Sequence, residues 1–88
     1  MKNKIILVED DVDLGTVLKQ YLEFSDFEVK WFSSPAALLE SISDYSGFDA
    51  AVLDVMLPGM DGFQLSKELR KHTQIPFLFL TAKGQSID

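Results

Sequence analysis

The stretch that decides the fold is residues 5–24, IILVEDDVDLGTVLKQYLEF, in which a short apolar run precedes a longer amphipathic one. The run at 5–8 has the length of a β-strand and is apolar at consecutive positions, which is typical of a strand buried on both faces. From 12 to 24 the apolar residues fall at 14, 17, 18, 21 and 22, the spacing of one helix face. Asp11 and Asp13 suit the start of that helix, because carboxylates accept hydrogen bonds from its free amide groups.

The same alternation of strand and helix continues along the chain. The further predicted elements are a strand at 27–32, a helix opened by Ser34 and Pro35, a strand from 48 or 49 to 54, a helix from 61 or 62 to about 72, and a strand at 77–80. The order βαβαβαβ predicts an α/β fold, an open parallel sheet with helices on both faces. The strand at 27–32 alternates apolar and charged residues and should be an edge, whereas the other three should be interior.

Simple roles are predicted for several side chains along these elements. The buried stripe of the second helix should comprise Leu38, Leu39, Ile42 and Tyr45, and the third helix should turn Leu65 and Leu69 inward. Asp61 should cap the third helix, and His72 should lie on the surface at its end. The aromatic residues are expected in the core, and Met56 and Met60 should pack within a loop at 55–61.

Composition limits the class of protein. Eighty-eight residues, of which 47% are hydrophobic, predict one globular domain. The chain has no cysteine, which excludes disulfides and thiolate metal sites. Its apolar runs are far shorter than the roughly 20 residues that span a bilayer, so we expect a cytoplasmic protein without membrane contact. The net charge of −6 and the scattered basic residues predict no direct nucleic-acid binding by this segment.

Polar side chains follow three of the predicted strands, at the edge of the sheet where such folds bind ligands. Glu9, Asp10 and Asp11 follow the first strand, Asp54 ends the third, and Thr81 follows the fourth. If the first and third strands are neighbours, the carboxylates of Asp10 and Asp54 converge and repel each other unless a cation lies between them. Mg²⁺ or Mn²⁺ suits such oxygen ligands, and an aspartate beside it can accept a phosphoryl group.

Three motifs in register resemble those of response-regulator receiver domains, the phosphate-accepting modules of two-component systems. They are ILVEDD at 6–11, LDVMLPGMDG at 53–62 and IPFLFLTA at 75–82, and their order and spacing match over nearly all 88 residues. The resemblance implies a flavodoxin-like receiver fold. It also implies Mg²⁺-dependent transfer of a phosphoryl group from a sensor histidine kinase to Asp54, as a signalling switch and not as a classical enzyme.

Carried over by position, the resemblance implies a role for each matching residue. Asp10 would be a direct metal ligand, and Glu9 would reach the metal through water. Asp54 would be both nucleophile and ligand, and Met56 would contribute its backbone carbonyl. Thr81 would hydrogen-bond the new phosphoryl group. The family's lysine and switch aromatic lie on a fifth strand, which these 88 residues are not expected to include. Lys83 is not that lysine, because it follows Thr81 too closely.

We therefore expect residues 1–88 to be one receiver domain that lacks a last helix, strand and helix. An apolar strand at 77–80 with no later strand to pair with is a template for association. The 88-residue chain is expected to self-associate, either by pairing these strands across a two-fold axis or by burying the uncovered sheet face against a second copy.

Two other functions compete. A haloacid-dehalogenase-like phosphatase begins with a strand followed by Asp-x-Asp, which Asp11, Val12 and Asp13 imitate, with Asp11 as the nucleophile. The register is unfavourable, because Glu9 and Asp10 intervene between the strand and that pair. The second alternative is a degenerate receiver used only as a binding module, which would fold but accept no phosphate.

Overall fold

The computed structural model describes residues 2–80. Four parallel strands alternate with three helices, as the sequence pattern predicts. In chain order the elements are β1 (Asn3–Val8), α1 (Val12–Phe24), β2 (Phe27–Phe32), α2 (Pro35–Ser41), β3 (Ala50–Asp54), α3 (Gly62–Arg70) and β4 (Phe77–Leu80). The strand order in the sheet is β2-β1-β3-β4. β2 is therefore added on one side of β1 and β3 on the other, so the strand order reverses between β1 and β3.

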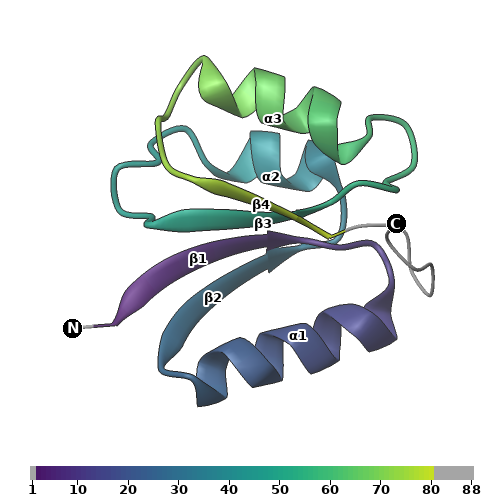
Figure 1. The fold of residues 1–88 in the computed structure, drawn as a ribbon. Coiled ribbons are helices and arrows are strands. Elements are labelled where there is room, and N and C mark those ends of the chain that lie inside the picture. Colours follow the sequence, from purple (N-terminus) through teal and green to yellow (C-terminus); the bar gives the residue numbers. More distant parts are fainter. Residues whose placement is uncertain (1, 81–88) are drawn as a thin grey trace, which may run out of the picture.

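Helices cover both faces of the sheet, as predicted. Figure 1 shows α1 on one face and α2 and α3 together on the other, with the sheet between them. Side chains alternate along a strand, so Ile6, Val8, Ala51 and Leu53 face α2 and α3 and form one core cluster with Leu38, Leu65 and Leu69. Leu7 and Val52 alternate with these residues along β1 and β3, so they face α1 on the other side of the sheet.

The polar residues predicted to start the helices do so. Asp11 Oδ1 and Ser34 Oγ each accept a hydrogen bond from the amide three residues on, at 3.1 Å in both cases. Asp61 and Gln64 form a reciprocal pair at the start of α3, in which each side chain accepts from the other residue's amide. This capping box satisfies two amides that would otherwise have no partner in the helix.

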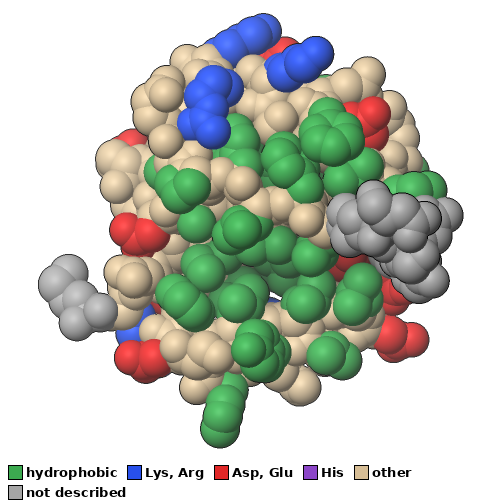
Figure 2. Space-filling view, viewed as in Figure 1, with side chains coloured by type: hydrophobic (Ala, Val, Ile, Leu, Met, Phe, Trp, Pro, Cys, Tyr) green, Lys and Arg blue, Asp and Glu red, His purple; other side chains and the backbone are tan. Residues whose placement is uncertain are grey.

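Strand burial agrees with the sequence for three strands. β2 is an edge, and β1 and β3 are interior. β4 pairs with β3, and within residues 2–80 no other strand pairs with it, so here it lies at the second edge. Leu78 is 58% exposed and Phe79 37% exposed. In Figure 2, hydrophobic side chains gather across the middle of the face that is turned to the viewer, between α3 and α1.

Some residues predicted to be buried are exposed. Leu39 lies outside the core, whereas Leu38 on the same helix is fully buried. On α1, Tyr21 and Phe24 are exposed although the aromatic residues were expected in the core, and Phe24 is 91% exposed. Val17, which shares the helical spacing of Tyr21, is exposed as well. The prediction was wrong here because α1 is in contact mainly with β2 and β1, so only part of its apolar stripe meets a neighbour.

Tyr45 and His72 are close in space. Tyr45 belongs to the core cluster, but it lies beyond Ser41, where α2 ends, so it is not part of a stripe on that helix as predicted. Its ring stacks on that of His72 with 6.3 Å between centroids. Burial raises the pKa of the Tyr45 phenol. His72 is exposed just beyond the end of α3, as predicted.

Candidate functional site

The strand order brings together the acidic residues that the sequence singled out. β1 and β3 are neighbours in parallel, with Val8 beside Leu53, so their carboxyl ends lie at one edge of the sheet. Glu9, Asp10 and Asp54 each offer a carboxylate oxygen, and these three oxygens lie within 4.8 Å of one another. Glu9 and Asp54 are completely buried, and Asp10 is half-buried. The convergence that was predicted from the strand ends is therefore present.

Glu9 is held through its side chain and both of its backbone groups. Its Oε2 accepts a hydrogen bond from the amide of Asp11 at 3.0 Å. Its backbone amide donates to the carbonyl of Phe32 on β2 at 3.1 Å, and its carbonyl accepts from the indole Nε1 of Trp31 at 2.9 Å. A buried carboxylate with these fixed partners is oriented before any ligand arrives.

Asp54 is oriented by the loop that follows it. Its Oδ1 accepts a hydrogen bond from the amide of Met56 at 3.0 Å, a tight side-chain turn of the kind that Asp favours. The start of α3 packs against the same residue, since a Cβ on Gly62 would lie 2.4 Å from the carbonyl oxygen of Asp54. Met56 itself has an exposed side chain, so its predicted packing within the loop is wrong, whereas Met60 packs against the core as expected.

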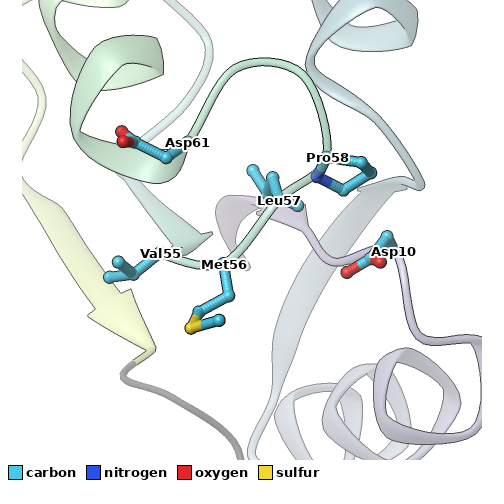
Figure 3. A pocket seen from close by; sticks show the side chains of 6 residues that line it. All are labelled: Asp10, Val55, Met56, Leu57, Pro58 and Asp61. Atoms are coloured by element: carbon cyan, nitrogen blue, oxygen red, sulfur yellow. The ribbon is translucent and has the colours of Figure 1, made fainter.

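A pocket of about 570 Å³ opens beside the acidic cluster. Its lining residues are Asp10, Val55, Met56, Leu57, Pro58 and Asp61. Figure 3 shows Asp10 on one side of the pocket and Asp61 on the other, with the loop from Val55 to Pro58 between them. The cluster therefore has an approach for a small polar ligand from the carboxyl ends of the strands, where parallel α/β sheets bind their ligands.

This set of donors fits a hard divalent cation. It consists of carboxylate oxygens from two neighbouring strand ends, and it includes no histidine or cysteine among the residues described. Mg²⁺ takes one or two carboxylates and keeps several waters, so a partly open cluster beside a pocket suits it better than a closed cage. Asp11 lies outside the cluster, because its carboxylate caps α1.

The sequence did not reveal two residues of the site. Trp31 was interpreted only as part of an alternating strand, and Gly62 only as a helix start. The motif at 53–62 contains Gly62, but the need for glycine appears only when α3 packs on Asp54. Thr81, predicted to contact the phosphoryl group, lies outside the described residues.

The chain belongs to the response regulator receiver domain family, whose model matches residues 5–88. Among curated relatives, the transcriptional regulatory protein SrrA of Staphylococcus aureus is 39% identical over 85 residues, which are 97% of this chain and 35% of SrrA. The chain spans little more than a third of the length of the curated relatives it matches. The family match confirms the resemblance seen in the three motifs. It also confirms the class that the resemblance implied, the phosphate-accepting signalling domains of two-component systems, which are not classical enzymes.

Solved structures agree with the fold. The non-phosphorylated HemR receiver domain of Leptospira biflexa is similar with a TM-score of 0.84 and 38% identity, covering 97% of this chain and 68% of that one. The BeF3-activated receiver domain of Klebsiella pneumoniae RstA gives a TM-score of 0.81 and 37% identity, covering 94% and 70%. Within residues 2–80, none of the helices is long and apolar enough to cross a membrane.

Proposed function

We propose that Asp54 is the phosphoryl acceptor of this receiver domain. The observation that carries the proposal is the buried Asp54 carboxylate, held by the Met56 amide within 4.8 Å of oxygens from Glu9 and Asp10. The similarity to a receiver domain solved in a BeF3-activated form supports it further. Asp54 ends a central strand, and the two residues that follow it, Val55 and Met56, line the pocket.

The metal site belongs to the same proposal. Asp10 and Asp54 would bind Mg²⁺ or Mn²⁺ directly, Glu9 would act through a water, and Met56 would add its backbone carbonyl. A metal held there would screen the negative charge that develops as a phosphoryl group approaches the carboxylate of Asp54. Affinity should be weak, because few protein ligands replace the waters of the ion.

The chemistry proposed for this chain is a single displacement at phosphorus. An oxygen of Asp54 attacks the phosphorus, and a new carboxylate–phosphate bond forms. The bond from phosphorus to the donor breaks, and the donor leaves with the bonding electron pair. Thr81 would hydrogen-bond the transferred group. The chain catalyses only its own phosphorylation and dephosphorylation.

The donor proposed is a phosphohistidine on a cytoplasmic sensor histidine kinase. The net charge of −6 and the absence of any basic run make direct contact with nucleic acid unfavourable. Since SrrA is a transcriptional regulatory protein, we propose that this domain controls an output carried elsewhere in a longer protein. We also propose that a chain of these 88 residues, taken by itself, associates with a second copy, either by pairing the β4 strands across a two-fold axis or by burying the uncovered sheet face.

The phosphatase alternative requires Asp11 as the nucleophile. Asp11 is exposed, its Oδ1 accepts the hydrogen bond that caps α1, and the matching family is that of receivers. A substitution of Asp11 should therefore cost some helix stability and leave phosphate acceptance intact, whereas the alternative predicts complete loss of activity. The binding-module alternative predicts a folded domain that accepts no phosphate.

The test is phosphorylation by a small acyl-phosphate donor with and without Mg²⁺, followed by intact-mass measurement. We expect one phosphoryl group on the unaltered chain with Mg²⁺, the same on Asp11→Asn, and none on Asp54→Asn. Titration with Mg²⁺ alone, followed by amide NMR shifts, should move residues 9–11 and 54–56. Equal phosphorylation of Asp54→Asn would overturn the assignment, and shifts confined to 11–16 would support the phosphatase.

A further inference from the structure

Trp31, the only tryptophan of the chain, lies beside the acidic site although it belongs to the edge strand β2. β1 and β2 pair as far as Val8 and Phe32. One residue further on, the indole Nε1 of Trp31 donates to the carbonyl of Glu9 at 2.9 Å. Glu9 is thus bound to β2 through both of its backbone groups, because its amide donates to the Phe32 carbonyl and its carbonyl accepts from the Trp31 indole. The indole extends the strand pairing into the segment that carries the acidic residues.

The same ring is pressed against α1. A Cβ on Gly15 would lie 2.1 Å from Cζ2 of Trp31 and 2.5 Å from Cε2, so no other residue type fits there without moving the indole. Glycine inside a helix is unfavourable by itself, so its presence at position 15 is explained by the close packing of the indole and not by helix stability. Gly15 also donates its amide to the carbonyl of Asp11, the residue that caps α1. Trp31 therefore touches the chain on both sides of Asp10.

We infer that Trp31 is a positioning residue for the acidic site. By holding the Glu9 carbonyl and the first turn of α1, it fixes the backbone from Glu9 to Asp11. That backbone determines where the carboxylates of Glu9 and Asp10 lie relative to Asp54. Metal ligands held by such outer contacts lose affinity when the contacts are removed. This inference rests on the proposed function in one respect, namely that Glu9, Asp10 and Asp54 form a cation site.

The variant that tests it is Trp31→Phe, which keeps an aromatic ring on β2 but removes both the N–H donor and the benzo-ring carbons that lie nearest Gly15. The matched control is Val29→Ala, which weakens the same strand two residues earlier, where Val29 pairs with Ile5. Affinity for Mg²⁺, measured from amide NMR shifts, should fall about tenfold in Trp31→Phe and remain unchanged in Val29→Ala. Unchanged affinity in Trp31→Phe, with binding intact in the parent chain, would overturn the inference.

A second measurement separates this inference from the proposed function. In metal-free protein, the amides of Asp10 and Asp11 should exchange with solvent about tenfold faster in Trp31→Phe, whereas Val29→Ala should speed exchange along β2. If the parent chain binds no Mg²⁺ but this local acceleration is seen, the metal site fails and the positioning role stands. If the acceleration is absent, the positioning role fails whether or not metal binds.

The single tryptophan adds a spectroscopic readout. Emission of Trp31 should change on titration with Mg²⁺, with the same midpoint as the amide shifts, and the change should vanish in Asp10→Asn. A replacement by benzothienylalanine, which exchanges the indole N–H for sulfur at nearly constant shape, repeats the affinity comparison if Trp31→Phe does not fold. Emission that is unaffected by Mg²⁺, in a chain whose amides shift, would contradict coupling between the indole and the site.

Discussion

β1 and β4 flank β3 on its two sides, and their sequences suggest the same environment. Both are apolar at consecutive positions, and both pair with β3 in parallel. One row of the sheet shows how they differ, because Leu7 of β1, Val52 of β3 and Leu78 of β4 lie side by side on the face that α1 covers in part. Leu7 is completely buried, whereas Leu78 is 58% exposed.

The difference teaches that an apolar pattern reports the burial a strand requires and not the burial that its neighbours supply. β1 has a strand on each side and helices on both faces. Among the residues described, β4 has one strand neighbour. Two side chains of α3 pack against it. The ring of Phe63 lies against that of Phe79 with centroids 4.8 Å apart, and the Arg70 guanidinium lies 3.9 Å from the centre of the Phe77 ring.

The largest expected effect contrasts the two leucines in this row. Leu7→Ala should lower the free energy of unfolding by about 2–5 kcal/mol, because it leaves a cavity in a close-packed interior. Leu78→Ala should lower it by less than about 1 kcal/mol, because the side chain is mostly in solvent already. Urea denaturation at low protein concentration measures both values. Equal losses would show that Leu78 is buried in solution, by a second copy or otherwise.

Association should depend on the β4 edge. Leu78→Lys places a charge on β4, which has one strand neighbour within residues 2–80, and we expect it to raise the dissociation constant of a dimer about tenfold or more. Phe24→Lys is the control, since it removes a large apolar side chain that is 91% exposed on α1 and far from β4 in sequence. Sedimentation at micromolar concentration distinguishes the two. A parent chain that is monomeric throughout would contradict association through β4.

The smallest effect concerns the cover that α3 gives β4. In a double-mutant cycle, Phe63→Ala and Phe79→Ala should show a coupling energy of about 0.5–1.5 kcal/mol, as expected for a tilted aromatic pair. Denaturation of the two single variants and the double variant gives the value. Additive losses would mean that α3 and β4 are stabilised independently.

Much of this fold could be predicted from local pattern. The starts of all three helices followed from capping residues, and the edge position of β2 followed from its alternation. The exposure of Val17 and Tyr21 could not be predicted, because helical spacing says which residues share a face and not how wide the neighbouring element is. The exposure of Leu78 could not be predicted either, because the apolar run at 77–80 does not show which elements cover the strand.

The acidic residues of the candidate site could be predicted from the sequence, but the contacts that hold them in place could not. Asp10 and Asp54 follow strands that parallel pairing brings together, so their convergence depends only on strand order. The hydrogen bond from Trp31 to Glu9 depends on the register of β2 against β1, and the fit of the indole on Gly15 depends on the position of α1 over the sheet. Neither leaves a signal in local sequence.

The measurement that tests the central claim most directly is to locate the phosphoryl group on the chain. Borohydride reduces an aspartyl phosphate to homoserine, so reduction after treatment with an acyl phosphate and Mg²⁺, followed by peptide mapping, identifies the residue that was modified. The account predicts homoserine at position 54 and at no other aspartate, with the signal lost when Mg²⁺ is omitted. Homoserine at position 10, 11 or 61, or none at all in a chain shown to be folded, would contradict it.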